Sequence, residues 1–214
     1  MRSFVLCLCL LISAQAGSAQ EPEKRIKTFD FKLFIDDREV GAHQFVVRQE
    51  SHSVQVSSKM SLDFKVWKVK RVTYRHYANE VWQSGCLISL DSETEKLGKN
   101  LSVIARAEQA GLVVDRVLDG KREQDIFPGC VRGFAYWNSD WLNADSLLNA
   151  ESGIYIPVKV NSLPAEIDGM TAVQIVLPKT GIDLDYDAAG EWMALETKLG
   201  IGGTLRYQRV FNSQ

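Results

Sequence analysis

The chain has 214 residues, 45% of them hydrophobic and 24% charged, and its 25 basic and 27 acidic side chains give a net charge of −2. So balanced a charge provides no general attraction to nucleic acid or to acidic membranes, and nucleic acid is not expected as a partner. The length is sufficient for one domain with a sizeable core.

The first 19 residues have the pattern of a secretory signal peptide. Arg2 supplies a positive charge, residues 4–14 are mostly apolar, and Gly17, Ser18 and Ala19 form a small-residue cleavage site. The apolar run is too short for a transmembrane helix, which needs roughly 20 residues. We therefore predict a signal peptide at 1–19 and a single β-rich periplasmic domain at 20–214, exported by a Gram-negative bacterium.

Two of the four cysteines, Cys86 and Cys130, lie outside the predicted signal peptide. In an oxidising compartment an even number of cysteines favours a disulfide, so we predict that these two residues are bonded. Two unpaired buried thiols and a redox-active pair are the alternatives. The redox alternative lacks the usual C-x-x-C spacing.

The strongest pattern in the chain is an alternation of apolar and polar residues over 54–66. Apolar side chains occupy every even position except Ser58, while the odd positions are polar. Such a period of two predicts a β-strand with one buried and one solvated face. The strand is more than twice the usual length of about 5–6 residues, so we expect the sheet to bend or coil.

Similar patterns, separated by turn residues, continue along the chain. They predict strands at 29–35, 40–48, 54–66, 72–82, 86–94, 101–107, 112–118, 154–160, 172–177, 182–187, 192–199 and 204–210. The fold is therefore predicted to be all-β: a single curved antiparallel sheet, or an open or closed barrel, of about 10–12 strands.

Residues 124–151 interrupt this pattern and predict one irregular, partly helical insertion. The segment contains Pro128, Gly129 and a group of large aromatic residues within 134–142. Asp140 or Asn143 is a candidate cap for one helical turn, and 145–150 is helical at best.

The sequence contains no recognisable catalytic or metal-binding motif. Its three histidines, His43, His52 and His76, lack the spacing of metal ligands, and we interpret His43 and His76 as ordinary strand residues. Motifs of serine hydrolases, zinc proteases and phosphate-binding loops are missing. We therefore predict no catalytic residue, no metal and no cofactor.

Three aspartates, Asp183, Asp185 and Asp187, alternate in one predicted strand. An EF-hand would need a glycine and a glutamate where Ala188 and Ala194 stand. A solvated strand face is the favoured interpretation, with a weak calcium site as the alternative.

One tract combines basic and aromatic residues, as in surfaces that bind by charge and stacking. A solvated strand face is the favoured interpretation. The alternative, in an exported protein, is a surface for an anionic lipid headgroup or an acidic glycan, which would imply a peripheral contact with the envelope. The tract comprises Lys65, Trp67, Lys68, Lys70, Arg71, Tyr74, Arg75, His76 and Tyr77.

Four segments resemble a family of exported bacterial proteins catalogued only as a domain of unknown function. They are 37–43, 80–94 followed by Gly98 and Lys99, 136–138, and 186–192. The family is similar to half-barrel periplasmic proteins of the lipoprotein-carrier type, in which a curved sheet surrounds an apolar cavity. The resemblance implies a fold and a compartment, and no catalytic residue.

Long amphipathic strands make more apolar surface than a short helix can cover, and a curved sheet can leave a cavity. We therefore predict a protein that binds or carries an apolar or amphipathic, lipid-like molecule of the envelope. The alternatives are an enzyme on the same scaffold that acts on an envelope glycan or lipid, and a structural or assembly factor of the envelope.

The aromatic residues of the insertion are the candidate ligand-binding site. Tryptophan and tyrosine offer a large contact area with a polar group, and loops on a rigid sheet often carry binding residues. We predict that Tyr136, Trp137 and Trp141 cover one mouth of the concave face, near Trp82 or Trp192. The alternative is that they plug the end of the barrel as part of its core.

Overall fold

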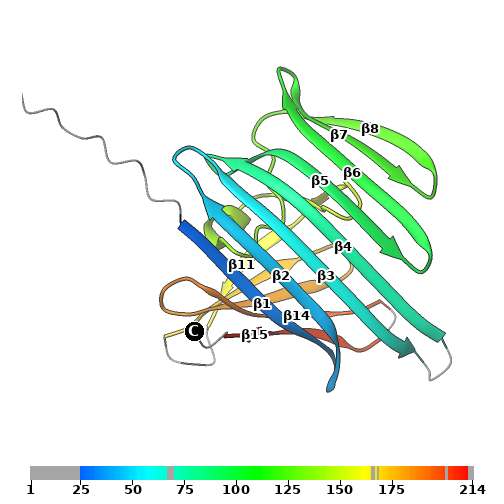
Figure 1. Ribbon diagram of the computed structural model, residues 1–214. Coiled ribbons are helices and arrows are strands. Elements are labelled where there is room, and N and C mark those ends of the chain that lie inside the picture. The colour runs from blue at the N-terminus through cyan, green and yellow to red at the C-terminus, as the bar shows by residue number, and fades with distance from the viewer. Residues whose placement is uncertain (1–24, 67–69, 165–166, 168, 201, 212–214) are drawn as a thin grey trace, which may run out of the picture.

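The computed structural model describes residues 25–66, 70–164, 167, 169–200 and 202–211, so the predicted signal peptide lies outside the described residues. The prediction of an all-β protein with a curved antiparallel sheet is confirmed (Figure 1). The strands are β1 (Arg25–Ile35), β2 (Arg38–Gln49), β3 (Val54–Val66), β4 (Lys70–Gln83), β5 (Cys86–Lys96), β6 (Lys99–Glu108), β7 (Gly111–Leu118), β8 (Lys121–Phe127), β9 (Ser146–Leu148), β10 (Tyr155–Pro157), β11 (Lys159–Leu163), β12 (Thr171–Val176), β13 (Gly181–Tyr186), β14 (Trp192–Lys198) and β15 (Thr204–Val210).

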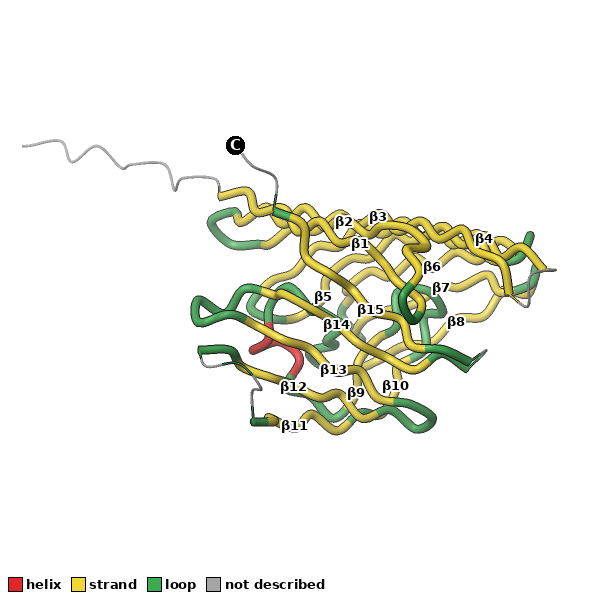
Figure 2. Tube along the Cα trace, turned by 90° about the horizontal axis from the view of Figure 1, so that it is seen from below, coloured by secondary structure: helices red, strands yellow, loops and turns green. Residues whose placement is uncertain are grey.

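Thirteen of these strands form one sheet, in the order β11-β12-β13-β14-β15-β1-β2-β3-β4-β5-β6-β7-β8. Two meanders, β1–β8 and β11–β15, are joined where β1 pairs with β15. Strands β8 and β11 are the free edges, so the sheet curls without closing (Figure 2). The concave face encloses the core.

Long strands and local bulges together produce the curl. Strand β3 pairs with β4 over its whole length, as the alternation of its residues predicts. Register shifts interrupt the pairing between Leu33 and Phe34 and between Val81 and Trp82, and such bulges bend a strand and increase its twist. At Gly41, β2 approaches β3 so closely that a Cβ atom would lie 1.9 Å from the carbonyl oxygen of Ser61.

The predicted insertion lies between β8 and β11 and contains one short 3-10 helix, η1 (Ser139–Leu142). Of the two expected caps, Asn143 is the C-cap and Asp140 lies in the first turn of the helix. The N-cap is Asn138, whose side-chain oxygen accepts a hydrogen bond from the backbone N–H of Asp140 at 3.2 Å. This position satisfies one of the free donors at the start of the helix.

The expected helix at 145–150 is wrong, because Ser146–Leu148 forms strand β9 and pairs with β10. Leu147 and Leu148 are both buried, and the backbone of Leu148 also bonds to Arg132. The expected strand 154–160 divides into β10 and β11 at Val158, whose N–H bonds to Asp145 instead of a sheet neighbour.

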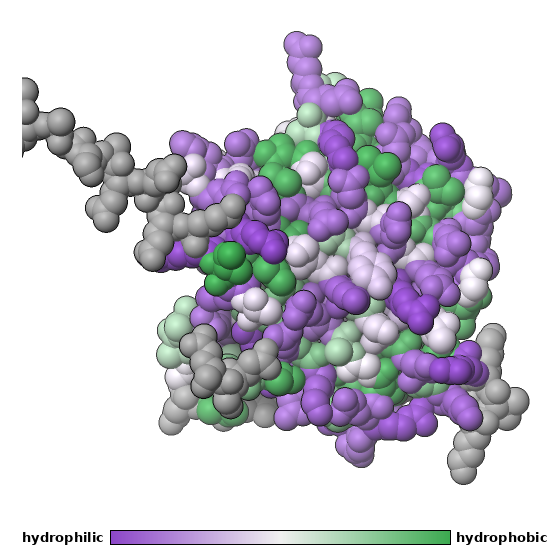
Figure 3. Space-filling view, viewed as in Figure 1, coloured by the Kyte–Doolittle hydropathy of each residue, from purple (hydrophilic) through white to green (hydrophobic). Residues whose placement is uncertain are grey.

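The outer face of the sheet shows hydrophilic residues interspersed with small apolar patches over β1–β4 (Figure 3). Within the described part of the chain, no helix is long and apolar enough to cross a membrane.

Candidate binding site on the concave face

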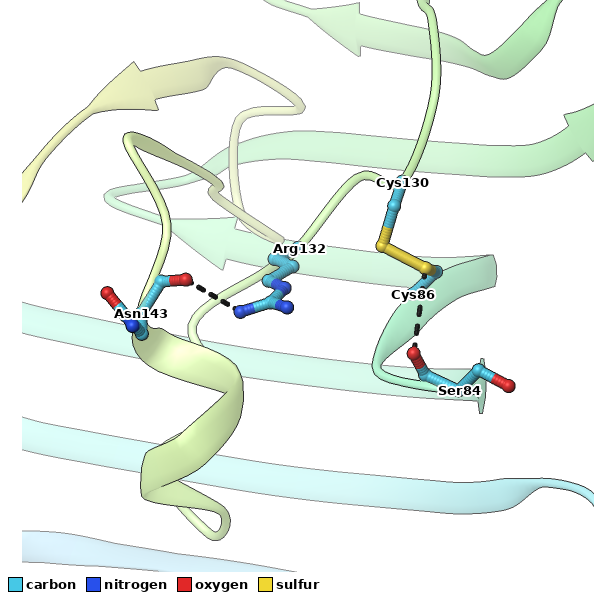
Figure 4. Close-up of a disulfide and its surroundings, with 5 residues drawn as sticks. All are labelled: Ser84, Cys86, Cys130, Arg132 and Asn143. Atoms are coloured by element: carbon cyan, nitrogen blue, oxygen red, sulfur yellow. Dashed lines mark hydrogen bonds between the residues drawn. A yellow bond between two sulfur atoms is a disulfide. The ribbon is translucent and has the colours of Figure 1, made fainter.

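The insertion is attached to the sheet by the predicted disulfide, which is confirmed. Cys86, at the start of β5, is bonded to Cys130, with a Cα–Cα distance of 5.1 Å (Figure 4). Beside it the N–H of Leu87 donates to the carbonyl oxygen of Val131 at 2.8 Å. These bonds fix the start of the insertion at the turn between β4 and β5.

The five predicted aromatic residues form two contact groups on the concave face. Trp82 contacts Trp137 and Trp141, with ring centroids 6.0 and 5.3 Å apart. Trp192 contacts Tyr136 at 5.3 Å. Trp82 and Trp192 are 1% and 0% exposed, whereas the three rings of the insertion are half-buried. The insertion therefore lies with its aromatic rings against the sheet.

The end of the insertion is held at the opposite end of β4 and β5. The side chain of Tyr74 donates to the carboxylate of Glu151 at 2.9 Å, and that of Lys96 does so at the same distance. Between the two ends, the hydroxyl of Ser92 donates to the carbonyl oxygen of Ala150 at 2.5 Å. The insertion thus crosses the concave face of these strands.

Two histidines that sequence analysis treated as ordinary strand residues also face the interior. His43 pairs with Met60 on β3, and Met60 pairs with His76 on β4, so the three side chains stand in one row. The Nδ1 atom of His43 lies 3.1 Å from the hydroxyl of Tyr207, and Nδ1 of His76 lies 2.7 Å from the hydroxyl of Thr94.

Burial controls the charge of these groups. It lowers the pKa of His43 to about 3, and the nearby His76 adds to this effect. Burial also lowers the pKa of His76 and raises the pKa of Tyr207. All three side chains are therefore neutral at neutral pH.

A carboxylate lies in the same interior. Glu80 accepts a hydrogen bond from the indole N–H of Trp82 at 2.7 Å. Burial raises the pKa of Glu80 to about 7, although the bond from Trp82 opposes this rise. Glu80 and Trp82 lie two positions apart on β4, so the alternation of the strand places both side chains on the inner face.

The predicted basic-aromatic tract does not form one surface. Arg71 and Arg75 form ion pairs on the outer face, with Asp63 and Glu95 respectively. Tyr74 and His76, in contrast, bond to inner-face partners, so the strand alternation divides the tract. Its members Trp67 and Lys68 fall outside the described residues.

The aspartates at 183, 185 and 187 do not converge on a metal site. Asp183 accepts a bond from Gln174, while Asp187 accepts bonds from two backbone N–H groups of its own turn. Over the residues that the structure describes, no group of three or more His, Cys, Asp or Glu side chains could hold a metal ion.

Fold and site together define an all-β, barrel-like domain in which one long sheet curls around an inserted segment. The chain belongs to the family described as Domain of unknown function DUF6134, whose model matches residues 31–210. The resemblance to a family catalogued only as a domain of unknown function is thereby confirmed.

The structure is also similar to the crystal structure of a "Beta-barrel-like Protein of Domain of Unknown Function DUF1849" from Brucella abortus. The TM-score is 0.58 at 11% sequence identity, and the match covers 90% of this chain and 98% of that chain. At this identity the similarity shows the fold alone. Comparison with curated proteins gives no match.

Proposed function

We propose that this protein binds or carries an apolar or amphipathic molecule of the cell envelope, held between the curved sheet and the inserted segment. The observation that carries the proposal is the boundary between these two layers. It consists largely of aromatic rings, with Trp82 and Trp192 of the sheet facing Tyr136, Trp137 and Trp141 of the insertion. Aromatic side chains give much contact area to apolar ligands.

The way the insertion is attached supports the same proposal. Its two ends are fixed, by the disulfide at Cys130 and by the bonds of Tyr74 and Lys96 to Glu151. Between them, Trp137 and Trp141 contact the sheet through ring packing. Such ring contacts are non-directional, so an apolar ligand can replace them, while the hydrogen bond from the hydroxyl of Tyr186 to the carbonyl oxygen of Tyr136, at 2.9 Å, keeps the backbone of the segment attached to the sheet.

Export to the periplasm is part of the proposal. The charged, apolar and small-residue segments of 1–19 support a signal peptide, and the disulfide suits an oxidising compartment. An envelope lipid or a related amphiphile would be the ligand available there.

Native mass spectrometry of the full chain, expressed with its leader and purified from periplasm without detergent, tests the proposal. We expect a fraction of the protein to carry a co-purifying lipid-like mass. The bound fraction should fall when Trp137 and Trp141 are both changed to Ala. Tyr77→Ala, at an exposed position of the outer face, is the matched aromatic control and should retain the ligand.

Two results would contradict the proposal. One is protein that carries no ligand and takes up none from added phospholipid vesicles. The other is hydrolysis of an added envelope glycan or lipid, which would favour the alternative that the same scaffold is an enzyme.

A further inference from the structure

One polar atom in the aromatic interior has no partner. The imidazole of His43 is 7% exposed, and its Nδ1 atom is engaged with the hydroxyl of Tyr207. Its Nε2 atom is buried and has no hydrogen-bond partner among the described residues. Buried side-chain nitrogen and oxygen atoms nearly always have a partner in folded proteins, so this atom requires an explanation.

Aromatic rings surround the imidazole of His43. Its ring packs on Phe45, with centroids 4.1 Å apart, and on Tyr207 at 5.7 Å. Tyr207 packs in turn on Phe31 and Trp192, at 5.6 and 5.8 Å. The unpaired nitrogen thus belongs to the same aromatic group that includes Trp192 of the proposed binding interior.

The polar neighbours of His43 are already hydrogen-bonded to other groups. The hydroxyl of Tyr207 is hydrogen-bonded to the Nδ1 atom of the same imidazole. It also lies 3.7 Å from the sulfur of Met60, a weak acceptor. His76, two strands away in the same row, is bonded to Thr94. The Nε2 atom of His43 is therefore available for a hydrogen bond to a molecule from outside the chain.

The chemistry of the site limits the class of that molecule. A neutral imidazole offers one hydrogen-bond donor or one acceptor, and the rings that touch it are Phe45 and Tyr207. The cation in its row is Arg209, which pairs with Phe31 on the other side of β1 and stacks on that ring. A carboxylate or phosphate at Nε2 would be desolvated while Arg209 lies across β1 from it. A hydroxyl, ester or amide group, in contrast, needs a single hydrogen bond and is compatible with aromatic walls.

We infer that His43 is the polar anchor of the binding interior, where its Nε2 atom hydrogen-bonds to an uncharged polar group of an acyl-chain molecule. A glyceride-like ester or alcohol fits this description, whereas a free fatty acid would place its carboxylate near Arg209 rather than at His43. The inference rests on the proposed function, because it presumes that the interior admits a ligand.

Three probes with apolar chains of matched length separate the contribution of the polar end to the binding affinity from that of the apolar chain. Monoolein has uncharged ester and hydroxyl groups, oleate has a carboxylate, and octadecene has no polar end. Each is titrated against the lipid-stripped mature protein, and binding is followed by tryptophan fluorescence, to which Trp192 beside Tyr207 contributes. We expect monoolein to bind at least about tenfold more tightly than octadecene, the factor for one hydrogen bond, while the affinity for oleate measures what a carboxylate gains from Arg209.

The variant His43→Phe keeps an aromatic ring and removes both nitrogens. We expect it to weaken monoolein binding about tenfold and to leave octadecene binding unchanged. His52→Phe is the matched control, since His52 is exposed in the turn between β2 and β3, and it should bind monoolein like the wild type.

A measurement on the unchanged protein keeps the test valid if the variant does not fold. In protein labelled with ¹⁵N-histidine, the Nε2 resonance of His43 should shift on addition of monoolein and not on addition of octadecene. An unmoved resonance, or an unchanged monoolein affinity in His43→Phe, would overturn the anchor while leaving the proposed function intact. If the wild type binds none of the three probes, the proposed function itself fails.

Discussion

The indole N–H of Trp82 donates to the carboxylate of Glu80 at 2.7 Å, although both residues belong to one strand and lie two positions apart. Their side chains share the concave face, so the bond holds a half-buried carboxylate against the core residue Trp82. Burial raises the pKa of Glu80 from 4.5 to about 7. The concave face therefore includes a group that changes its charge near neutral pH.

The free energy of unfolding should depend on Glu80 between about pH 4.5 and 7. In this window the folded protein binds more protons at Glu80 than the unfolded chain does, so this contribution falls as pH rises. The loss approaches about 3 kcal/mol above pH 7. Glu80→Gln does not titrate and should be more stable than the wild type at pH 8, by up to that amount.

Urea denaturation of wild type and variant at a series of pH values measures this difference. The exposed Glu93→Gln on β5 serves as the control and should follow the wild type. The difference in the free energy of unfolding between wild type and Glu80→Gln could instead be independent of pH. That result would show that the Glu80 carboxyl titrates in the folded protein as it does in the unfolded chain.

Replacing both Cys86 and Cys130 with Ser should lower stability without abolishing the fold. The bond spans a sequence separation of 44 residues, for which loss of the cross-link costs about 4 kcal/mol in the chain-entropy model. The large core should still fold, because it includes both layers of aromatic residues. Thermal unfolding by circular dichroism tests this, and a variant without β-structure would contradict it.

Changing Trp137 and Trp141 to Ala distinguishes a lid from a core plug. Both rings are half-buried, so we expect ligand retention to fall while the free energy of unfolding changes by less than about 3 kcal/mol. Native mass spectrometry and thermal unfolding of the same samples measure the two quantities. A loss of about 3–5 kcal/mol for each truncation would identify the segment as a plug.

Gly41→Ala should destabilise the protein by about 1–3 kcal/mol or more, the usual cost of overpacking. A Cβ atom at this position would lie 1.9 Å from the carbonyl oxygen of Ser61, so β2 and β3 would have to separate. Gly200→Ala is the control, because a Cβ atom there meets no other atom within 4 Å. Equal stability of the two variants in urea would show that the strands adjust without strain.

The mature protein should begin at Gln20 if 1–19 is a signal peptide. Intact-mass analysis of the periplasmic fraction measures this directly. A mass that still includes Met1, or that includes an added lipid, would exclude cleavage at the predicted site.

Most strands could be predicted because their alternation is visible within one segment. The exceptions have identifiable causes. Strand β8 begins with a run of polar residues and is exposed over most of its length, as befits an edge strand, so its two faces do not differ in the sequence. At β9 the sequence predicts a helix instead of a strand, because three residues are too few to show a period of two.

The contacts of the aromatic residues in the candidate site were predictable, and the arrangement of its polar residues was not. Tyr136, Trp137 and Trp141 stood out as a cluster in an irregular segment. His43 and His76 lie in phase with buried residues, but only the register across β2, β3 and β4 brings them into one row. Tyr207 comes from the last strand, and a pairing over so long a separation leaves no local signal.

The pairing of β1 with β15 determines when the large sheet can finish folding. A chain is synthesised from its N-terminus, so β1 is the first strand to be made. Its neighbour β15 is the last. Until 204–210 are available, one side of β1 exposes unpaired backbone groups to other chains. Contacts of such long separation also form slowly. We therefore expect a shorter product that ends before β15 to aggregate.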